Sequence, residues 1–239
     1  MLTKNQIKFI KGLSSKKNRI EHQCFIVEGE KSVLELLMSD FEIIDLYAVD
    51  SFIKESDFAE ITLITNNELA QISSLKSPNK VLAVVKIPQA IEANRKGVII
   101  VLDSVNDPGN LGTIIRLCDW FGVQQIICSE DTVDMFNPKV VQASMGSLFR
   151  TNIFYTSLKN YLKEVETPIF GTFTDGSNIK DLDKLPEDVH LIFGNESNGI
   201  SEEVTSLVTN RVAVKNIGLK TESLNVAMAT AIFLHEFCA

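Results

Sequence analysis

The stretch Asn106-Asp-Pro-Gly-Asn-Leu-Gly-Thr-Ile-Ile-Arg116 decides how this chain folds. It follows the apolar run Val98–Leu102, which is short, rich in β-branched residues and not alternating, as expected of a strand buried on both faces. Because proline presets φ and glycine tolerates positive φ, Asp107-Pro-Gly109 predicts a turn. Apolar residues then recur at helical spacing until Gly122, which is placed to end a helix. The pattern therefore predicts a buried strand that leads through a polar turn into a helix.

Two polar side chains of this helix carry the first functional expectation. Asn110 stands near its start, and Arg116 lies under two turns further along, on roughly the same side. An amide and a guanidinium are therefore expected to face one spot at the carboxyl end of the strand. Ligands of open α/β sheets usually bind at that edge.

Basic residues are concentrated at the start of the chain. The formal net charge of the 239 residues is −8, yet the first 20 contain no acid and six basic residues, which are Lys4, Lys8, Lys11, Lys16, Lys17 and Arg19. The remainder carries 17 basic against 31 acidic groups. This overall acidity argues against broad, non-specific binding of nucleic acid. The basic start is either a solvated helix or a local patch that contacts the phosphates of a structured RNA.

The composition is that of a globular protein, with 45% hydrophobic and 23% charged residues. No apolar run reaches the length of a membrane span, and the first residues lack the apolar core of a signal peptide. The four cysteines are far apart, which predicts reduced thiols in a cytoplasmic protein. Neither they nor the three histidines show metal-ligand spacing, so we expect no metal site and no membrane association.

Strands alternate with helices along the whole chain, which predicts two α/β units with mainly parallel sheets. The first unit covers residues 1–90, with strands expected at 25–27, 43–49, 61–65 and 81–87 and polar turn material at 14–19. A polar linker is expected at 91–97. The second unit covers residues 98–239, with further strands expected at 125–128, 152–155, 168–173, 189–193 and 211–214.

Two further stretches of the second unit carry chemistry. Gly194-Asn-Glu-Ser-Asn-Gly199 follows an apolar strand, and its glycines allow the backbone to approach a ligand closely. Glu196 is either a functional carboxylate or an acid before the next helix. Ser223-Leu-Asn-Val226 opens a helix that is apolar on nearly all sides, which indicates burial or a partner surface. Ser223 is expected to be its N-cap, and capping alone would also explain Ser223 and Asn225.

Taken together, the three stretches resemble the three sequence motifs of the SpoU (TrmH-like) class of the SPOUT RNA methyltransferases. The resemblance covers residues 98–239. Residues 1–87 resemble the small RNA-binding domain found ahead of this module, through Ser14-Ser-Lys-Lys-Asn-Arg19 and Phe25-Ile-Val-Glu-Gly29. The chain departs from the family pattern at Lys215, where proline is usual, and at Ser197, where glycine is frequent.

The resemblance implies an α/β domain with a deep trefoil knot, a homodimer, and S-adenosylmethionine as methyl donor. The implied reaction is methylation of a ribose 2′-hydroxyl, with ribosomal RNA as the first choice of substrate and transfer RNA as the second. The implied catalytic residues are Arg116, Asn110, Glu196, Ser223 and Asn225. The implied cofactor contacts are Thr172, Phe173, Gly194, Val214, Ile217 and Leu224. The implied RNA contacts are Lys16, Lys17 and Arg19.

The role of Arg116 stays open at this point. Family mechanisms often make the corresponding arginine the base that deprotonates the hydroxyl, although arginine is normally protonated at all accessible pH values. The alternative is that Arg116 grips the neighbouring phosphate and stabilises the developing oxyanion. A second hypothesis for the whole protein is an RNA-binding or assembly protein that has kept the fold without turnover. A nucleotide-binding oxidoreductase is disfavoured, because Gly109-Asn-Leu-Gly112 lacks the G-x-G-x-x-G pattern.

Overall fold

The computed structural model describes residues 1–53, 61–89, 95–182, 185–218 and 220–238. The chain divides into two compact units, one made of Met1–Gln89 with Asp134–Phe149 and one made of Ala90–Val133 with Arg150–Ala239. Residues 91–94 of the expected linker lie outside the described ranges. Within those ranges, none of the helices is long and apolar enough to span a membrane.

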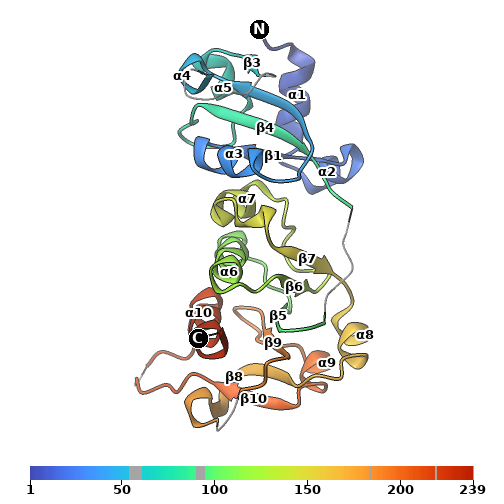
Figure 1. Ribbon diagram of the computed structural model, residues 1–239, viewed down its shortest axis with the longest axis vertical. Helices are drawn as coiled ribbons and strands as arrows, with labels where there is room; N and C mark the ends of the chain where they lie inside the picture. Colours follow the sequence, from blue (N-terminus) through green and yellow to red (C-terminus); the bar gives the residue numbers. More distant parts are fainter. Residues whose placement is uncertain (54–60, 90–94, 183–184, 219, 239) are drawn as a thin grey trace. The chain divides into compact units, whose positions relative to one another are not determined.

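The N-terminal unit contains a four-stranded sheet with the strand order β1-β4-β2-β3 (Figure 1). Its strands are β1 (Cys24–Glu28), β2 (Ile43–Ala48), β3 (Thr62–Leu63) and β4 (Val81–Lys86). β4 runs antiparallel to both β1 and β2, whereas β2 and β3 are parallel. The expectation of a mainly parallel sheet is therefore wrong for this unit. Alternation of strands and helices predicts helical cover, but it does not determine the direction in which a final strand enters a sheet.

Helices cover this sheet. They are α1 (Lys4–Gly12), α2 (Lys16–His22), α3 (Glu30–Leu37), α4 (Asp50–Ile53) and α5 (Asn66–Ile72). α1 and α5 each begin with a capping box, from Thr3 and Thr65. Apolar residues of both helices join one face of the sheet in a core that includes Ile10, Leu69 and Ile26. Helix α2 occupies the stretch expected to be a turn.

A segment distant in sequence completes this unit. Asn137 caps α7 (Pro138–Ser144) through its side-chain oxygen, and a 3-10 turn follows at Ser147–Phe149. α7 ends at Ser144, and the next two residues, Met145 and Gly146, both adopt positive φ. Phe136, just before α7, packs on Phe25 of β1 with ring centroids 4.5 Å apart.

The second unit contains a six-stranded sheet in which every described pair of neighbours is parallel, in the order β10-β8-β9-β5-β6-β7. Its strands are β5 (Val98–Leu102), β6 (Gln125–Cys128), β7 (Asn152–Tyr155), β8 (Ile169–Asn178), β9 (Val189–Phe193) and β10 (Asn210–Ala213). This confirms the predicted α/β fold. β8 continues past the expected end at residue 173, and Gly176 lies against the backbone of Val212, where a Cβ would come within 2.5 Å of the carbonyl carbon.

Helices pack on both faces of this sheet. α6 (Pro108–Phe121) and α10 (Val226–Cys238) lie side by side on one face, where Phe233 meets Phe193 of β9 (Figure 1). α8 (Leu158–Lys163) and α9 (Glu202–Thr205) cover the other face in a core with Ile99 and Ile192. The central strands β5 and β9 are thus buried on both faces, as their unbroken apolar runs predict.

Candidate active site

The first motif places Asn110 on the first turn of α6. Asp107 is the N-cap, and its carboxylate accepts a hydrogen bond of 2.8 Å from the backbone N–H of Asn110. Pro108 follows at the first helical position, where its missing N–H costs nothing. This turn chemistry holds the Asn110 side chain at the carboxyl end of β5.

The second motif forms a tight loop after β9. The backbones of Asn195 and Gly199 exchange two hydrogen bonds of 2.9 Å. A Cβ on Gly194 would lie 2.1 Å from the carbonyl carbon of Gly199, so only glycine fits there. The Asn195 side chain accepts bonds from the N–H groups of Ser197 and Asn198 inside the loop, and it donates one of 2.7 Å to the carbonyl of Ser104. The loop is therefore anchored to the end of β5.

The third motif begins α10 with Asn225. Its side-chain oxygen accepts bonds from the N–H groups of Ala227 (3.0 Å) and Met228 (3.3 Å). The expected N-cap, Ser223, is wrong, because the helix starts at Val226 and Ser223 is exposed three residues earlier. Asparagine caps as well as serine does, so the sequence offered two equivalent choices.

The three motifs meet in one hydrogen-bonded cluster. The amide of Asn225 donates to the side-chain oxygen of Asn110 (2.9 Å), and the amide of Asn110 donates to the Glu196 carboxylate (2.7 Å). The direction of this chain follows from the cap: because the Asn225 oxygen is used by α10, its nitrogen faces Asn110. Glu196 is exposed, and its second oxygen has no partner within the described ranges. The cluster therefore presents a free carboxylate oxygen to a ligand.

Arg116 does not join this cluster. It is exposed, and no hydrogen bond or ion pair links it to another described residue. The expectation that it shares a side with Asn110 is wrong, since at 3.6 residues per turn a spacing of six leaves the two positions about 120° apart around the helix. Trp120, one turn beyond Arg116 on the same face, is 84% exposed.

The expected cofactor contacts lie on β8, in the glycine loop after β9 and in the segment after β10. Thr172 on β8 donates from its hydroxyl to the carbonyl of Ile192 at 2.9 Å, and the guanidinium carbon of Arg211 lies 3.5 Å from the centre of the Phe173 ring. Gly194 lies in the same loop as Glu196. Val214 is half-buried after β10, whereas Ile217 and Leu224 are 89% and 50% exposed.

These residues fit a nucleoside cofactor. Ile217 and Leu224 offer apolar side chains that the described part of the chain leaves uncovered. The backbone N–H groups of Asn216 and Ile217 have no acceptor among the described residues, so they are available to bind a ligand. Apolar surface beside a few free backbone donors is the typical lining of a small-molecule site.

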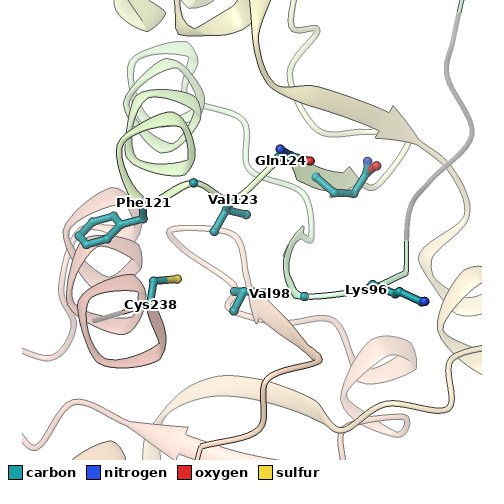
Figure 2. Close-up of a pocket in the computed structure, with 9 residues that line it drawn as sticks. Lys96, Val98, Phe121, Val123, Gln124 and Cys238 are labelled. Carbon is teal, nitrogen blue, oxygen red and sulfur yellow. The ribbon is translucent and has the colours of Figure 1, made fainter.

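Two cavities in the described part of the second unit lie at opposite ends of β5. One, of about 230 Å³, borders the first and second motifs and is lined by Asn106 and Asn195 among others. Figure 2 shows the other, of about 170 Å³, where Val98 begins β5 and where Phe121 and Cys238 end α6 and α10. The cavity of Figure 2 is therefore remote from the motif loops.

The basic residues of the N-terminal unit have two different environments. Lys16 and Lys17 are exposed on α2. Arg19 is 2% exposed; its guanidinium donates to Asp134 at 2.6 Å and 3.0 Å and to the carbonyls of Leu13 and Ser14 at 2.9 Å. We correct the assignment of Arg19 from RNA contact to structural residue, because its donors are already satisfied inside the unit.

Several residues of the site were missed from the sequence. Asp103 is buried at the end of β5 and accepts a hydrogen bond of 2.8 Å from the N–H of Ser201. Ser104 adopts positive φ and Asn195 organises the second loop. A polar residue directly after a buried strand could have pointed to Asp103, whereas no local signal marks the other two. The described residues include no group of three or more metal-ligating side chains.

Comparison with known proteins agrees with this geometry. Residues 97–235 match the SpoU rRNA Methylase family, and residues 4–83 match the MRM3-like substrate binding domain. The chain is 30% identical over 98% of its length, and over 96% of the relative, to the 23S rRNA (guanosine(2553)-2′-O)-methyltransferase RlmP of Bacillus subtilis.

Solved structures are similar over nearly the whole chain. A protein from Porphyromonas gingivalis assigned to the TrmH family of RNA methyltransferases is 36% identical, with a TM-score of 0.91 and coverage of 99% of this chain and 98% of that one. An rRNA methyltransferase from Sinorhizobium meliloti with bound AdoMet is 28% identical, with a TM-score of 0.87 and coverage of 99% and 95%. The chain belongs to the SpoU rRNA methylase family.

Proposed function

We propose that this protein transfers the methyl group of S-adenosylmethionine to the 2′-hydroxyl of a ribose in ribosomal RNA. The observation that carries the proposal is the Asn225–Asn110–Glu196 hydrogen-bonded chain, which joins three sequence motifs at one edge of a parallel sheet. The relatives named above support the same reaction, since one is a 2′-O-methyltransferase of 23S rRNA and another was solved with AdoMet.

The chain's own residues have to align and activate a poor nucleophile. When bound, S-adenosylmethionine supplies a methyl group that is already electrophilic. A ribose hydroxyl attacks well only when it is held in line and loses its proton. The free oxygen of Glu196 can accept that hydroxyl's hydrogen bond, while Asn110 and Asn225 hold the carboxylate in place. The Ser223 hydroxyl is exposed two residues from Asn225 and is available to orient the ribose.

Arg116 has two roles compatible with its exposed position. It can grip the phosphate beside the target ribose and stabilise the developing oxyanion, or it can take the proton of the hydroxyl. The first role needs only the charge that arginine always carries. The second needs a guanidinium that is shielded from water. We favour the clamp, because α6 leaves Arg116 in solvent.

We place the cofactor against β8 and the loops after β9 and β10. In this proposal, Gly194, Val214 and Leu224 supply the closest contacts, with Thr172, Phe173 and Ile217 around them. Lys215 replaces the usual proline after β10 and leaves the backbone there less restricted in φ. The deep trefoil knot implied by the family resemblance is part of the same proposal.

We further propose that the protein is a homodimer. Trp120 of α6 and Met228 of α10 are 84% and 59% exposed on neighbouring helices. Large apolar side chains gathered on one helix pair indicate an interaction surface. Sedimentation at micromolar concentration tests this, with Trp120→Glu expected to give the monomer.

The N-terminal unit is proposed to bind the RNA, with Lys16 and Lys17 contacting phosphates. Its match to a substrate binding domain supports this assignment. We retain residues 1–90 as the RNA-binding domain, 91–97 as the linker and 98–239 as the methyltransferase domain. Free thiols at all four cysteines are compatible with a cytoplasmic protein.

Methyl transfer from tritiated S-adenosylmethionine tests the proposed function directly. The substrate is 23S rRNA transcribed in vitro from the gene of the same organism. We expect label in RNA, recovered after digestion as a 2′-O-methylnucleoside. Label on a base would contradict ribose methylation. Tight RNA binding without any label would support the alternative of an inactive assembly protein.

A further inference from the structure

The Glu196 side chain has little support of its own. It is exposed, and its one hydrogen bond among the described residues comes from the Asn110 amide at 2.7 Å. A reacting group is efficient only when it is held in place, because a displacement of about 1 Å can cost roughly 100-fold in rate. The contacts that fix the loop at residues 194–201 therefore determine where the carboxylate lies.

One dipeptide at the end of β5, Asp103-Ser104, holds this loop at three points. The backbone N–H of Asp103 donates to the carbonyl of Phe193 at 2.9 Å, just before the loop. The carbonyl of Ser104 accepts a bond of 2.7 Å from the Asn195 side chain. The carboxylate of Asp103 accepts one of 2.8 Å from the N–H of Ser201, where the loop ends. Both ends of the loop are thus attached to the same two residues.

The Asp103 carboxylate is used entirely inside the protein. It is 4% exposed, and its second oxygen accepts from the Ser104 hydroxyl at 3.4 Å. A carboxylate buried to this degree is tolerated only when it is hydrogen-bonded, and bonds from N–H groups to a charged acceptor are the stronger kind. Its partner Ser201 is also the N-cap of α9, which packs on the sheet through Val204. Asp103 therefore fixes the C-terminal end of the loop between β5 and α9.

Ser104 adopts a conformation that residues with a Cβ seldom adopt. Its φ is +59°, in the left-handed region. Its N–H donates to the Ser129 hydroxyl oxygen at 2.8 Å, and its own hydroxyl donates to Asp131 at 2.6 Å. Backbone in this region persists only where surrounding contacts hold it, and it is concentrated at functional sites. Here the turn presents the Ser104 carbonyl to Asn195.

Asn195 fixes the backbone beside Glu196. Its side-chain oxygen accepts from the N–H groups of Ser197 and Asn198 at 2.9 Å and 3.1 Å, while its nitrogen donates to Ser104. Both polar atoms of the amide are therefore occupied within the protein, and the side chain is half-buried. Asn195 is thus placed to orient its neighbour Glu196 rather than to bind a ligand.

We propose that Asp103 and Asn195 are positioning residues for methyl transfer, an inference that rests on the proposed function. They act through Glu196, which they hold against Asn110 from the two ends of its loop. The chain runs directly from Ser104 to Asn110, so one short segment carries both the anchor of the loop and the partner of the carboxylate. Loss of either anchor lets Glu196 move away from the ribose hydroxyl without removing a group that touches substrate.

A double-mutant cycle tests this. Single-turnover methylation of the 23S rRNA transcript, at saturating S-adenosylmethionine, is measured for the wild type, Asn195→Ala, Glu196→Gln and the double variant. We expect Asn195→Ala to lose roughly 10- to 100-fold in rate. In the Glu196→Gln background the same substitution should cost less than about 2-fold, because a residue that acts through another has no effect once the other is gone. A loss caused by misfolding would instead be equal in both backgrounds.

Asp103 gives a second, independent cycle. Asp103→Asn keeps the shape of the buried side chain but removes the charge that strengthens the bond to Ser201, so we expect a loss of roughly 5- to 10-fold that is again absent in the Glu196→Gln background. Asn152→Ala is the matched control. Asn152 is also half-buried, and its side chain donates to Gln125 at 2.8 Å at the amino end of β7. This variant should lose stability in urea and keep the wild-type rate.

Equal losses in the two backgrounds would overturn the proposal and leave the methyltransferase function intact. Near wild-type rates for both Asn195→Ala and Asp103→Asn would overturn it as well, and so would a near wild-type rate for Glu196→Gln. A loss that disappears for one residue only would support that residue and exclude the other. If Asn195→Ala fails to fold, the Asp103→Asn cycle decides. Absence of label from the wild-type protein on any RNA would refute the proposed function instead.

Discussion

The side-chain amide of Asn110 donates to the carboxylate of Glu196 across 2.7 Å, joining two residues 86 positions apart in the chain. Asn110 also accepts from Asn225, so it uses its donor and its acceptor at once. An amide does both through two separate atoms, its nitrogen and its oxygen. This bifunctional position makes the cluster sensitive to substitutions that conserve shape but change hydrogen bonding.

Asn110→Asp should therefore reduce kcat by roughly 100-fold, a loss of about 3 kcal/mol of the kind measured when one transition-state donor is removed. The new carboxylate cannot donate to Glu196 and repels it. Single-turnover methylation measures the effect. Asn160→Asp, an exposed change on α8, is the control. A near wild-type rate for Asn110→Asp would separate the cluster from the chemistry.

Arg116→Ala should keep cofactor affinity and lose most turnover, because the side chain contacts no other described residue. Arg116→Lys distinguishes the two proposed roles. A phosphate clamp retains part of its effect with lysine, which keeps the positive charge. A base would instead give the lysine variant a kcat that rises with pH toward the lysine pKa. Calorimetry for binding and a pH profile for kcat check both expectations.

Gly194→Ala should be severely destabilising, by about 3 kcal/mol or more, because the added methyl would meet the Gly199 backbone at 2.1 Å. Backbone cannot move aside as a side chain can. Urea unfolding and cofactor titration measure the loss. Gly12→Ala is the comparison, since its Cβ meets the flexible end of Asn18 at 2.9 Å. Equal stability of the two variants would contradict the observed loop.

Substitution of Arg19 should lower the stability of the folded state, whereas substitution of Lys16 and Lys17 should weaken RNA binding. Arg19→Met leaves Asp134 and two carbonyls without their donor, so we expect a loss of roughly 3 to 5 kcal/mol. Lys16→Met with Lys17→Met should change stability by less than about 0.5 kcal/mol. The double variant should bind RNA less tightly, with a shallower salt dependence. Filter binding at several salt concentrations and urea unfolding provide both measurements.

The burial of His190 predicts that the free energy of unfolding decreases in acid. It is fully buried between the Tyr161 hydroxyl and the Thr167 hydroxyl, each 2.9 Å from a ring nitrogen. Desolvation, and secondarily the charge of Arg95, lower its pKa to about 4. Below pH 6.5 the imidazole of His190 therefore binds a proton in the unfolded chain. In the folded chain it stays unprotonated down to about pH 4. Stability from this group is complete above pH 6.5 and falls by up to roughly 3 kcal/mol toward pH 4.

Unfolding in urea at pH 7, 5.5 and 4.5 measures this dependence. His190→Gln keeps hydrogen-bonding capacity but does not titrate, so its stability should vary less with pH than that of the wild type. An identical pH slope in the two proteins would show that other groups cause the acid sensitivity.

Much of the methyltransferase domain was predictable, because its signals are local. The strand at Val98–Leu102 and the helix stop at Gly122 depend on a few adjacent residues, and both appear as expected. Pro108 and Gly109, expected in a turn, are instead the first residues of α6. The family resemblance grouped Asn110, Glu196 and Asn225 with Arg116 and Ser223, and hydrogen bonds between described residues join the first three only. Parallel strands bring their carboxyl ends to one edge, which makes such a meeting predictable.

The sequence by itself determined which segments form strands, turns and helices in the second unit, since caps, periodicity and turn residues act over one or two helical turns. Only the tertiary structure decided that β4 runs antiparallel, that Asp134–Phe149 packs with the N-terminal unit, and that Arg19 is buried. Those outcomes depend on contacts between residues that are far apart in the chain. A local sequence pattern does not determine the free energy of such contacts.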